Sequence, residues 1–369
     1  MITAITMPKW GLTMTEGKVV QWLKPPGAAF AAGAELLEIE TSKITNVVEA
    51  DAAGTLSRIV ATEGTTLPIG ALLAVIAPSN TPAADIDAFV AQFVVVAPAD
   101  DDAAEATQVA PRELQVGGQM LRCLELGSGD GPAVLLLHGF GGDLNTWMFN
   151  QPALCPDHRT LALELPGHGL SGKDVGAGDV AAFTDAIDTA LSALKVERLH
   201  VVGHSMGGAL AIALATRDPA RIATLTLLAP AGLGPEINGG FINAFVRATR
   251  RREATEALQL LVHDPALISR VMVEETLRYK RLDGVPRSLE TVAAAWFPQG
   301  RQAVDLRETL RALRPPVQVI CGRDDRIIPA AHAEAIADVA RVSVLDNVGH
   351  LPHMERAGEV NRLIRAMTA

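Results

Sequence analysis

Apolar and polar positions divide the chain into two parts with different periodicities. Up to about residue 78, short runs of strand-forming residues alternate with turns that contain glycine or proline. The clearest of these runs are 18–23, 35–40, 55–60 and 72–76. From about residue 113, continuous apolar runs such as 133–137 alternate with stretches at helical spacing. The pattern predicts a small all-β domain at 1–78 and an α/β domain at 113–369, with a mostly parallel sheet covered by helices on both faces.

Two stretches depart from these patterns. Residues 79–112 are rich in Ala, Pro and acidic residues, which is typical of a linker, and apolar residues at helical spacing predict a short helix at 84–94 within it. That helix either packs on one of the domains or docks a partner protein. As a flexible coil the linker would span about 30 Å, and about 110 Å when fully extended. The second departure lies at about 231–300, where helical, Arg-rich sequence interrupts the sheet pattern.

The composition is that of a globular protein in a reducing compartment. The chain has 369 residues, of which 49% are hydrophobic and 20% charged, so two domains are expected. A net charge of −10 argues against a broad nucleic-acid-binding surface. Three scattered cysteines, no leader pattern and no apolar run near the length of a bilayer span predict a cytoplasmic protein that contacts no membrane. The histidines lack metal-ligand spacing, so no metal is expected.

Lys43 is the candidate modification site of the N-terminal domain. It follows Glu40-Thr-Ser and is flanked by strand-like residues, which places it at a hairpin tip. A lone lysine is ordinarily a solvated surface charge. This stretch and the opening Met-Pro-Lys-Trp-Gly-Leu-Thr-Met-Thr-Glu-Gly (7–17) nevertheless resemble the lipoyl domains, the swinging-arm carriers of 2-oxo acid dehydrogenase-type complexes. The resemblance implies that lipoate is attached covalently to Lys43.

Two neighbours of this lysine bear on the assignment. Ser42 stands where lipoyl domains usually have Asp, which weakens the match slightly. Biotinyl domains share the fold but place their lysine between methionines, and Ser42 and Ile44 do not fit that pattern. Lipoate is therefore favoured over biotin.

The C-terminal domain contains a serine in a distinctive setting. Gly203-His-Ser-Met-Gly207 follows an apolar run and precedes the small and aliphatic residues 209–215, which predicts a strand, a sharp turn and a helix. Glycines two residues to either side of Ser205 are needed because the turn strains the serine backbone and neighbouring side chains would clash. The pattern resembles the nucleophile elbow of α/β-hydrolases. It implies that Ser205 is the nucleophile.

A serine nucleophile needs a base, and the base needs an anion that holds its tautomer. In this family the three residues follow in the order Ser, Asp, His. Asp324 and Asp325 are adjacent after a predicted strand, and the family pattern Gly-x-x-Asp-x-x-x-Pro selects Asp325 as the acid. The pattern Gly-His-x-Pro selects His350 as the base, whereas His353 is expected at the start of a helix.

The same resemblance assigns the groups that stabilise an oxyanion. His138-Gly-Phe-Gly-Gly142 follows the apolar run 133–137 and forms the expected loop. The family assigns the two donors to the backbone N–H groups of Phe140 and Met206. Glu164 and His168 lie in a second family loop and are interpreted as structural residues.

The helical insertion at 231–300 corresponds in this family to a cap over the active site. Its basic residues either form a solvated face or bind the phosphates of a nucleotide-bearing thiol such as coenzyme A. These residues are Arg247, Arg250, Arg251, Arg252, Lys280 and Arg281.

The combination of domains indicates acyl transfer. The His-x-x-x-Asp-Gly motif of the usual acyltransferases of such complexes does not occur in the sequence. Over its whole length the chain resembles instead the acyltransferase (E2) component of bacterial acetoin dehydrogenase complexes. The resemblance implies that an acetyl group passes from the dihydrolipoyl arm of Lys43 through Ser205 to coenzyme A. It also implies a thiamine-diphosphate-dependent E1 and a dihydrolipoyl dehydrogenase E3 as partners, with the chain itself in a homo-oligomer.

A second interpretation remains open at this point. The serine domain could be an independent esterase or thioesterase that uses water, with the lipoyl domain as a carrier or tether only.

Overall fold

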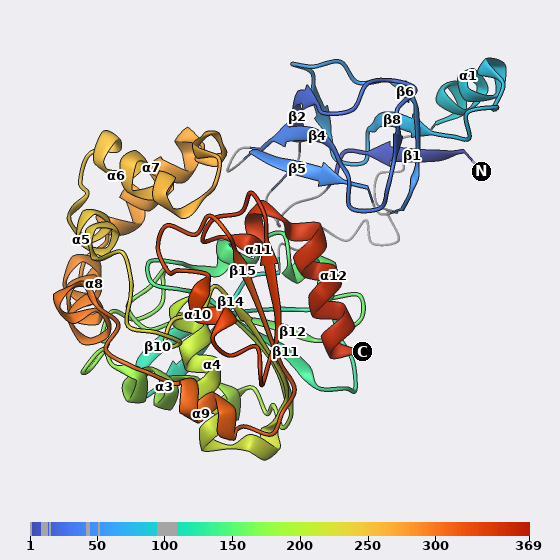
Figure 1. Cartoon of the computed structure of the whole chain (residues 1–369). Coiled ribbons are helices and arrows are strands. Elements are labelled where there is room, and N and C mark those ends of the chain that lie inside the picture. The colour runs from blue at the N-terminus through green and yellow to red at the C-terminus, as the bar shows by residue number, and fades with distance from the viewer. Residues whose placement is uncertain (1, 9–13, 15, 42–44, 51, 94–108) are drawn as a thin grey trace. The chain divides into compact units, whose positions relative to one another are not determined.

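The computed structural model divides the chain into two units, Met1–Gln108 and Val109–Ala369 (Figure 1). It describes residues 2–8, 14, 16–41, 45–50, 52–93 and 109–369. Lys43, the candidate lipoyl-attachment site, lies outside these ranges. No helix within the described ranges combines the length and the apolar character needed to cross a bilayer.

The described part of the N-terminal unit contains two four-stranded antiparallel sheets. The strand orders are β1-β8-β6-β3 and β5-β4-β2-β7. The strands are β1 (Thr3–Thr6), β2 (Glu16–Trp22), β3 (Ala29–Phe30), β4 (Glu35–Glu40), β5 (Thr45–Glu49), β6 (Gly54–Ile59), β7 (Thr66–Pro68) and β8 (Leu72–Ile76). Leu37 and Ile39 from one sheet share a buried core with Leu56 and Leu73 from the other. The small all-β domain predicted from the alternating pattern is confirmed.

Helix α1 (Ala83–Gln92) packs against this unit. Ile86 is buried in a cluster with Leu72 and Val75 of β8, and Phe89 and Phe93 lie partly buried beside them. The apolar residues that predicted the helix thus face the unit's own sheet. Because this face is already covered, the domain-packing interpretation of the helix is favoured over docking of a partner through the same residues.

The C-terminal unit is built on an eight-stranded sheet with the order β16-β15-β14-β13-β11-β12-β10-β9. Its strands are β9 (Arg112–Val116), β10 (Gln119–Leu126), β11 (Ala133–Leu137), β12 (Thr160–Glu164), β13 (Leu199–His204), β14 (Ile222–Leu228), β15 (Val317–Gly322) and β16 (Arg341–Leu345). Only β10 pairs antiparallel, with β9 and β12, while the other neighbours pair in parallel. The mostly parallel sheet expected from the sequence is confirmed.

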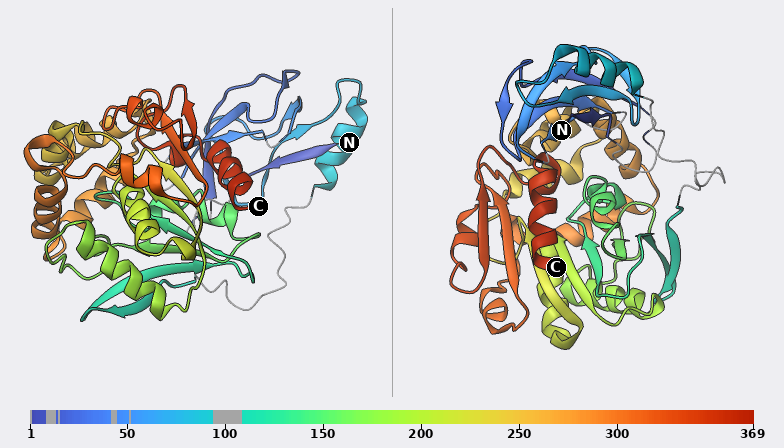
Figure 2. Two further views of the ribbon diagram at one scale, coloured as in Figure 1. Left: turned by 60° about the horizontal axis from the view of Figure 1, so that its bottom comes forward. Right: turned by 90° about the vertical axis from the view of Figure 1, so that its right-hand side faces the viewer.

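Helices cover this sheet on both sides (Figures 1 and 2). Helices α3 and α4 pack against each other on one face of the sheet. Helix α12 contacts α2 on the other face. The helices around the sheet are α2 (Gln151–Leu154), α3 (Val180–Ala193), α4 (Met206–Arg217), α9 (Arg307–Ala312), α10 (Ala331–Glu334), α11 (Pro352–Glu355) and α12 (Ala357–Thr368). Short 3-10 helices lie at Leu144–Trp147, Pro219–Arg221, Gln259–Leu261, Pro265–Leu267 and Pro298–Gly300.

The segment between β14 and β15 carries the helices that form the cap. They are α5 (Gly239–Arg247), α6 (Arg251–Leu258), α7 (Arg270–Lys280) and α8 (Val285–Trp296). Helix α5 contacts both α8 and α6, and α6 in turn contacts α7. The four helices form a group of their own (Figure 1). The side chains of Asn238 and Ser269 accept hydrogen bonds at the N-termini of α5 and α7, which fixes where these helices begin.

The packing of α1 predicts that the helix contributes to the stability of the N-terminal unit. Replacing Ile86 with Ala should lower the free energy of unfolding of this unit by about 2 to 3 kcal/mol, because a buried aliphatic side chain is lost. Replacing Asp87 removes an exposed ion pair with Arg58 and should have an effect below about 1 kcal/mol. Calorimetry of the full chain measures both variants, and equal losses would contradict the packing role of α1.

Candidate active site

Ser205 lies at the turn between β13 and α4 in a strained backbone conformation. Its φ of 53° and ψ of −115° fall in a region that side-chain-bearing residues rarely adopt. The strain is held by backbone hydrogen bonds on both sides of the residue. The N–H of Ser205 donates to the carbonyl of Leu228 at 2.9 Å, and its carbonyl accepts the N–H of Ala231 at 3.0 Å. The turn that follows β13 is therefore fixed to the end of β14.

The glycines around Ser205 are required by close backbone contacts. A Cβ on Gly203 would lie 2.3 Å from the carbonyl oxygen of Gly207, and a Cβ on Gly207 would lie 2.1 Å from that of Leu137. No side chain fits at these distances, since both obstacles are backbone atoms. The absence of side chains lets α4 begin directly over the ends of β11 and β13. The steric reason inferred from the sequence is confirmed at both positions.

His350 and Asp325 come together as a buried pair. Nδ1 of His350 lies 2.7 Å from Oδ2 of Asp325, and the two side chains are 3% and 1% exposed. The other carboxylate oxygen of Asp325 accepts the N–H groups of Ile327 and Ile328 at 2.8 and 3.0 Å. Because a carboxylate accepts at Nδ1, the neutral ring carries its lone pair on Nε2, the atom that a general base uses.

The neighbouring acid has a different environment. The carboxylate of Asp324 lies 3.0 Å from Nδ1 of His263, and both side chains are more than 40% exposed. The structure therefore brings Asp325, and not Asp324, to His350.

His204 connects the base to the serine turn. It precedes Ser205, and its Nε2 donates a hydrogen bond to the backbone carbonyl of His350 at 2.9 Å. The two imidazole rings have centroids 4.9 Å apart. No role was predicted for His204 from the sequence, although its place inside the glycine-flanked turn marked it as a neighbour of the nucleophile.

The loop after β11 lies directly against Ser205. A Cβ on Gly139 would be 3.0 Å from Cβ of Ser205. Among the described residues, no backbone carbonyl accepts the N–H group of Phe140 or of Met206. Met206 follows Ser205 as the first residue of α4, and Phe140 follows Gly139 in the loop. They remain our candidates for the oxyanion donors.

The cap packs on this same loop. The ring of Phe140 contacts Phe245 of α5 and Phe297 after α8, with centroid distances of 5.8 and 5.9 Å. The ammonium group of Lys280 is buried and donates to the carbonyls of Phe245 and Ala248. Burial lowers the pKa of Lys280 to about 8. The C-terminal end of α5 is thus held against the loop that carries Phe140.

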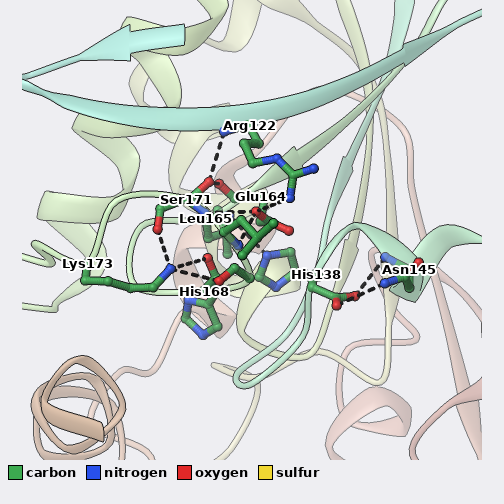
Figure 3. A network of polar contacts seen from close by, with 11 residues as sticks. Arg122, His138, Asn145, Glu164, Leu165, His168, Ser171 and Lys173 are labelled. Carbon is green, nitrogen blue, oxygen red and sulfur yellow. Dashed lines mark hydrogen bonds and ion pairs between the residues drawn. The ribbon is translucent and has the colours of Figure 1, made fainter. Parts of the chain in front are cut away.

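Glu164 and His168 contact the protein backbone, as expected for structural residues. The carboxylate of Glu164 accepts the N–H groups of Leu170 and Ser171 at 2.7 and 3.0 Å and lies 3.5 Å from a guanidinium nitrogen of Arg122 (Figure 3). Burial raises the pKa of Glu164. Nδ1 of His168 donates to the carbonyl of Pro166 at 2.8 Å.

Four histidines other than His350 are buried around the site. Burial lowers the pKa of His138 to about 4 and those of His168 and His353 to about 3, and that of His204 is also well below its ordinary value. His353 lies in the first turn of α11 between the rings of Trp147 and His204. These rings are neutral at pH 7.

Half of the basic cap residues already have internal partners. Arg251 pairs with Glu274 at 2.6 Å and Arg252 with Glu256 at 2.7 Å, while Lys280 is buried as described above. Three basic cap residues remain, namely Arg247, Arg250 and Arg281. They are exposed and form no ion pair with other described residues. The hypothesis of a phosphate-binding face is thereby reduced to these three arginines.

Comparisons with known proteins cover both units. A family described as alpha/beta hydrolase fold matches residues 132–357, and a family described as biotin-requiring enzyme matches residues 3–76. Two curated proteins, from Pseudomonas putida and Cupriavidus necator, are 44% and 42% identical to the chain over 99% of its length. The alignments cover 98% and 96% of those proteins, respectively. Each is named dihydrolipoyllysine-residue acetyltransferase component of acetoin cleaving system.

Solved structures resemble the C-terminal unit in fold. A meta-cleavage product hydrolase from Pseudomonas fluorescens IP01 matches with a TM-score of 0.64 at 23% identity, over 70% of this chain and 97% of that one. At this identity the likeness concerns the fold alone.

The buried histidines predict that the C-terminal unit loses stability in mild acid. Between about pH 6.5 and pH 3 the unfolded chain binds a proton at His353 that the folded unit does not, so the free energy of unfolding falls as the pH falls. Each such histidine contributes about 1.4 kcal/mol per pH unit in its window.

Replacing His353 with Phe keeps an aromatic ring beside Trp147 and removes one protonation site. We expect the loss of stability between pH 6.5 and pH 4.5 to be smaller by about 2 kcal/mol in His353→Phe than in the unsubstituted protein. Denaturant titrations at both pH values measure the difference. An unchanged pH dependence would show that His353 is not held neutral by the fold.

Proposed function

The chain belongs to the family of dihydrolipoyllysine-residue acetyltransferase components of acetoin-cleaving systems, and we propose that it moves an acetyl group from S-acetyldihydrolipoyl-Lys43 to coenzyme A through Ser205, His350 and Asp325. The observation that carries the proposal is the buried His350–Asp325 pair. His204, the residue before the strained Ser205, donates to the backbone carbonyl of His350, in a chain whose other unit matches a carrier domain. In this account Lys43 carries the lipoate.

The first half of the reaction forms an acetyl-serine. His350 accepts the proton of the Ser205 hydroxyl as the oxygen attacks the thioester carbonyl of the arm. The C–S bond then breaks, and His350 returns the proton to the departing dihydrolipoyl thiol. Asp325 stabilises the imidazolium that exists between these two transfers.

The second half reverses the roles of the two thiols. His350 accepts the proton of the coenzyme A thiol, whose sulfur attacks the acetyl-serine carbonyl. The ester bond breaks, and the proton passes to the oxygen of Ser205. In both halves the N–H groups of Phe140 and Met206 donate to the negatively charged carbonyl oxygen.

Transfer requires that coenzyme A reach the acetyl-serine ahead of water. Ser205 is 6% exposed and His350 3%, so little of the nucleophile or the base is in contact with bulk water. A thiol that is bound and oriented has a large advantage over free water in attacking the same ester. The alternative function, an esterase or thioesterase that uses water, requires ready access of water to the acetyl-serine.

The packing of α1 shortens the tether that the carrier can use. The tether runs from Phe93 to Val109, and an extended chain of this length spans at most about 55 Å. This is about half the span expected for the whole of 79–112. Within one chain, Phe93 of the carrier unit therefore lies no farther than this from Val109.

The family also suggests the setting in which the chain acts. We infer that it assembles with a thiamine-diphosphate-dependent E1 and with dihydrolipoyl dehydrogenase E3, as a homo-oligomer in the cytoplasm. The E1 component would place the acetyl group on the arm, and the E3 component would reoxidise the arm after transfer.

Product partition tests the proposed function. Lipoylated protein supplied with an acetyl group on the arm and with coenzyme A should yield acetyl-CoA in large excess over free acetate. Ser205→Ala and Lys43→Arg should each abolish the product, since the first lacks the nucleophile and the second lacks the arm. Acetate as the main product would establish the hydrolase instead.

The three unpaired cap arginines are our candidates for the coenzyme A phosphates. Replacing Arg247, Arg250 and Arg281 together with Ala should raise the KM for coenzyme A on the order of 10-fold or more and leave kcat for ester cleavage unchanged, because charge-assisted bonds to phosphate are lost. The matched control is Arg252→Ala, because Arg252 is also exposed on the cap but pairs with Glu256. An equal KM in all variants would exclude this phosphate site.

A further inference from the structure

Glu355 is a buried carboxylate that the acyl-transfer steps do not use. It ends α11 and is 8% exposed. Its Oε1 accepts the N–H of Gly349 at 2.9 Å and that of Leu351 at 3.3 Å. Its Oε2 accepts the N–H of His263 at 2.7 Å. Burial raises the pKa of Glu355, while its three backbone N–H donors act in the opposite direction.

Two of these bonds bracket the proposed general base. Gly349 and Leu351 are the residues on either side of His350, so the carboxylate fixes the backbone on both sides of the imidazole. The third donor, His263, belongs to the cap segment 259–263, which follows α6. A single side chain therefore joins the base loop to the cap.

The cap segment also touches the base loop directly. The N–H of His350 donates to the carbonyl of Leu261 at 2.7 Å. A Cβ on Gly349 would lie within 2.8 Å of the backbone of Leu261, Val262 and His263. The two backbones are thus in close contact, and only glycine at position 349 allows it.

The loop that carries Asp325 also binds the cap segment 259–263. The guanidinium group of Arg326 donates to the carbonyls of Gln259 and Val262, the latter at 2.6 Å. Asp324 lies 3.0 Å from the imidazole of His263. Arg326 and Asp324 flank Asp325 in the sequence, so the segment 259–263 is bound on one side by the acid loop and on the other by the base loop.

From this arrangement we propose that Glu355 is a positioning residue that couples His350 to the cap segment 259–263. The imidazole is held in its working orientation only while this segment is seated between the two loops. Removing the segment takes away the carbonyl of Leu261 from the His350 backbone and one of the three donors from Glu355. The inference rests on the proposed role of His350 as the general base, and it adds the requirement that the cap be in place for proton transfer.

A matched pair of variants tests the coupling. Glu355→Gln keeps the shape but replaces one acceptor oxygen with an N–H donor, so at least one backbone N–H loses its acceptor. Glu164→Gln is the control, because Glu164 is also a buried carboxylate that accepts two backbone N–H groups, from a loop that does not carry His350. The probe is 4-nitrophenyl acetate, whose cleavage reports acetylation of Ser205 by the full chain.

We expect Glu355→Gln to lower kcat for acetylation on the order of 10- to 100-fold with KM within about 2-fold, since a small displacement of a reacting group has effects of this size. Glu164→Gln should lower the melting temperature as well but keep kcat within about 2-fold. The low-field proton resonance of the His350–Asp325 hydrogen bond should shift or disappear in Glu355→Gln and persist in the control.

Two results would overturn the coupling. One is an unchanged kcat and an unchanged resonance in Glu355→Gln, and the other is an equal loss of kcat in both variants. Should Glu355→Gln not fold, Glu355→Asp retains the charge on a shorter side chain, and a wild-type kcat in that folded variant would also overturn it. Full ester cleavage by Ser205→Ala would instead refute the proposed function, so the two failures are distinguishable.

Discussion

The close approach of α4 to the ends of β11 and β13 is the constraint on which the site depends. Gly203 and Gly207 lie within van der Waals distance of the backbone of the neighbouring elements, and this contact forces Ser205 into its positive φ. The turn places the hydroxyl and the N–H of Met206 at one edge of the sheet. Because β15 and β16 run parallel to β13, the loops after them bring Asp325 and His350 to that same edge.

The cap closes the site by contacts on two sides. On one side Phe245 packs on Phe140 beside the candidate oxyanion donors. On the other side the segment 259–263 lies between the acid and base loops. A site built in this way holds its groups in place before the substrate arrives, which is how electrostatic stabilisation of the reacting carbonyl becomes effective. It also limits contact with bulk water, as a transfer reaction through an ester of Ser205 requires.

The sequence predicted those features that depend on local pattern. The alternation of apolar residues located the strands, and the glycines around Ser205 identified the turn because a local steric requirement dictates them. The order of the acidic and histidine-bearing loops after predicted strands placed them at a common edge, since parallel strands end there. The family patterns were needed to select Asp325 over Asp324 and His350 over His353.

Features that depend on the partner of a side chain were not predictable in this way. Helical spacing identified the apolar face of α1 but not the sheet that covers it. The pairing of Arg251 with Glu274 joins two helices, and it removes a cap arginine that in the sequence was equivalent to Arg250. No local pattern identified Glu355, which accepts a hydrogen bond from a residue as distant in the sequence as His263. Such roles require knowledge of which segments meet in space.

The most direct test of the account is to follow the acetyl group itself. Lipoylated protein with an isotopically labelled acetyl thioester on the arm of Lys43 would be quenched rapidly in the absence of coenzyme A, and its peptides analysed by mass spectrometry. The account predicts label on Ser205, which disappears as labelled acetyl-CoA forms when coenzyme A is added. Formation of acetyl-CoA at the full rate in Ser205→Ala, with the label found only on the arm, would contradict it.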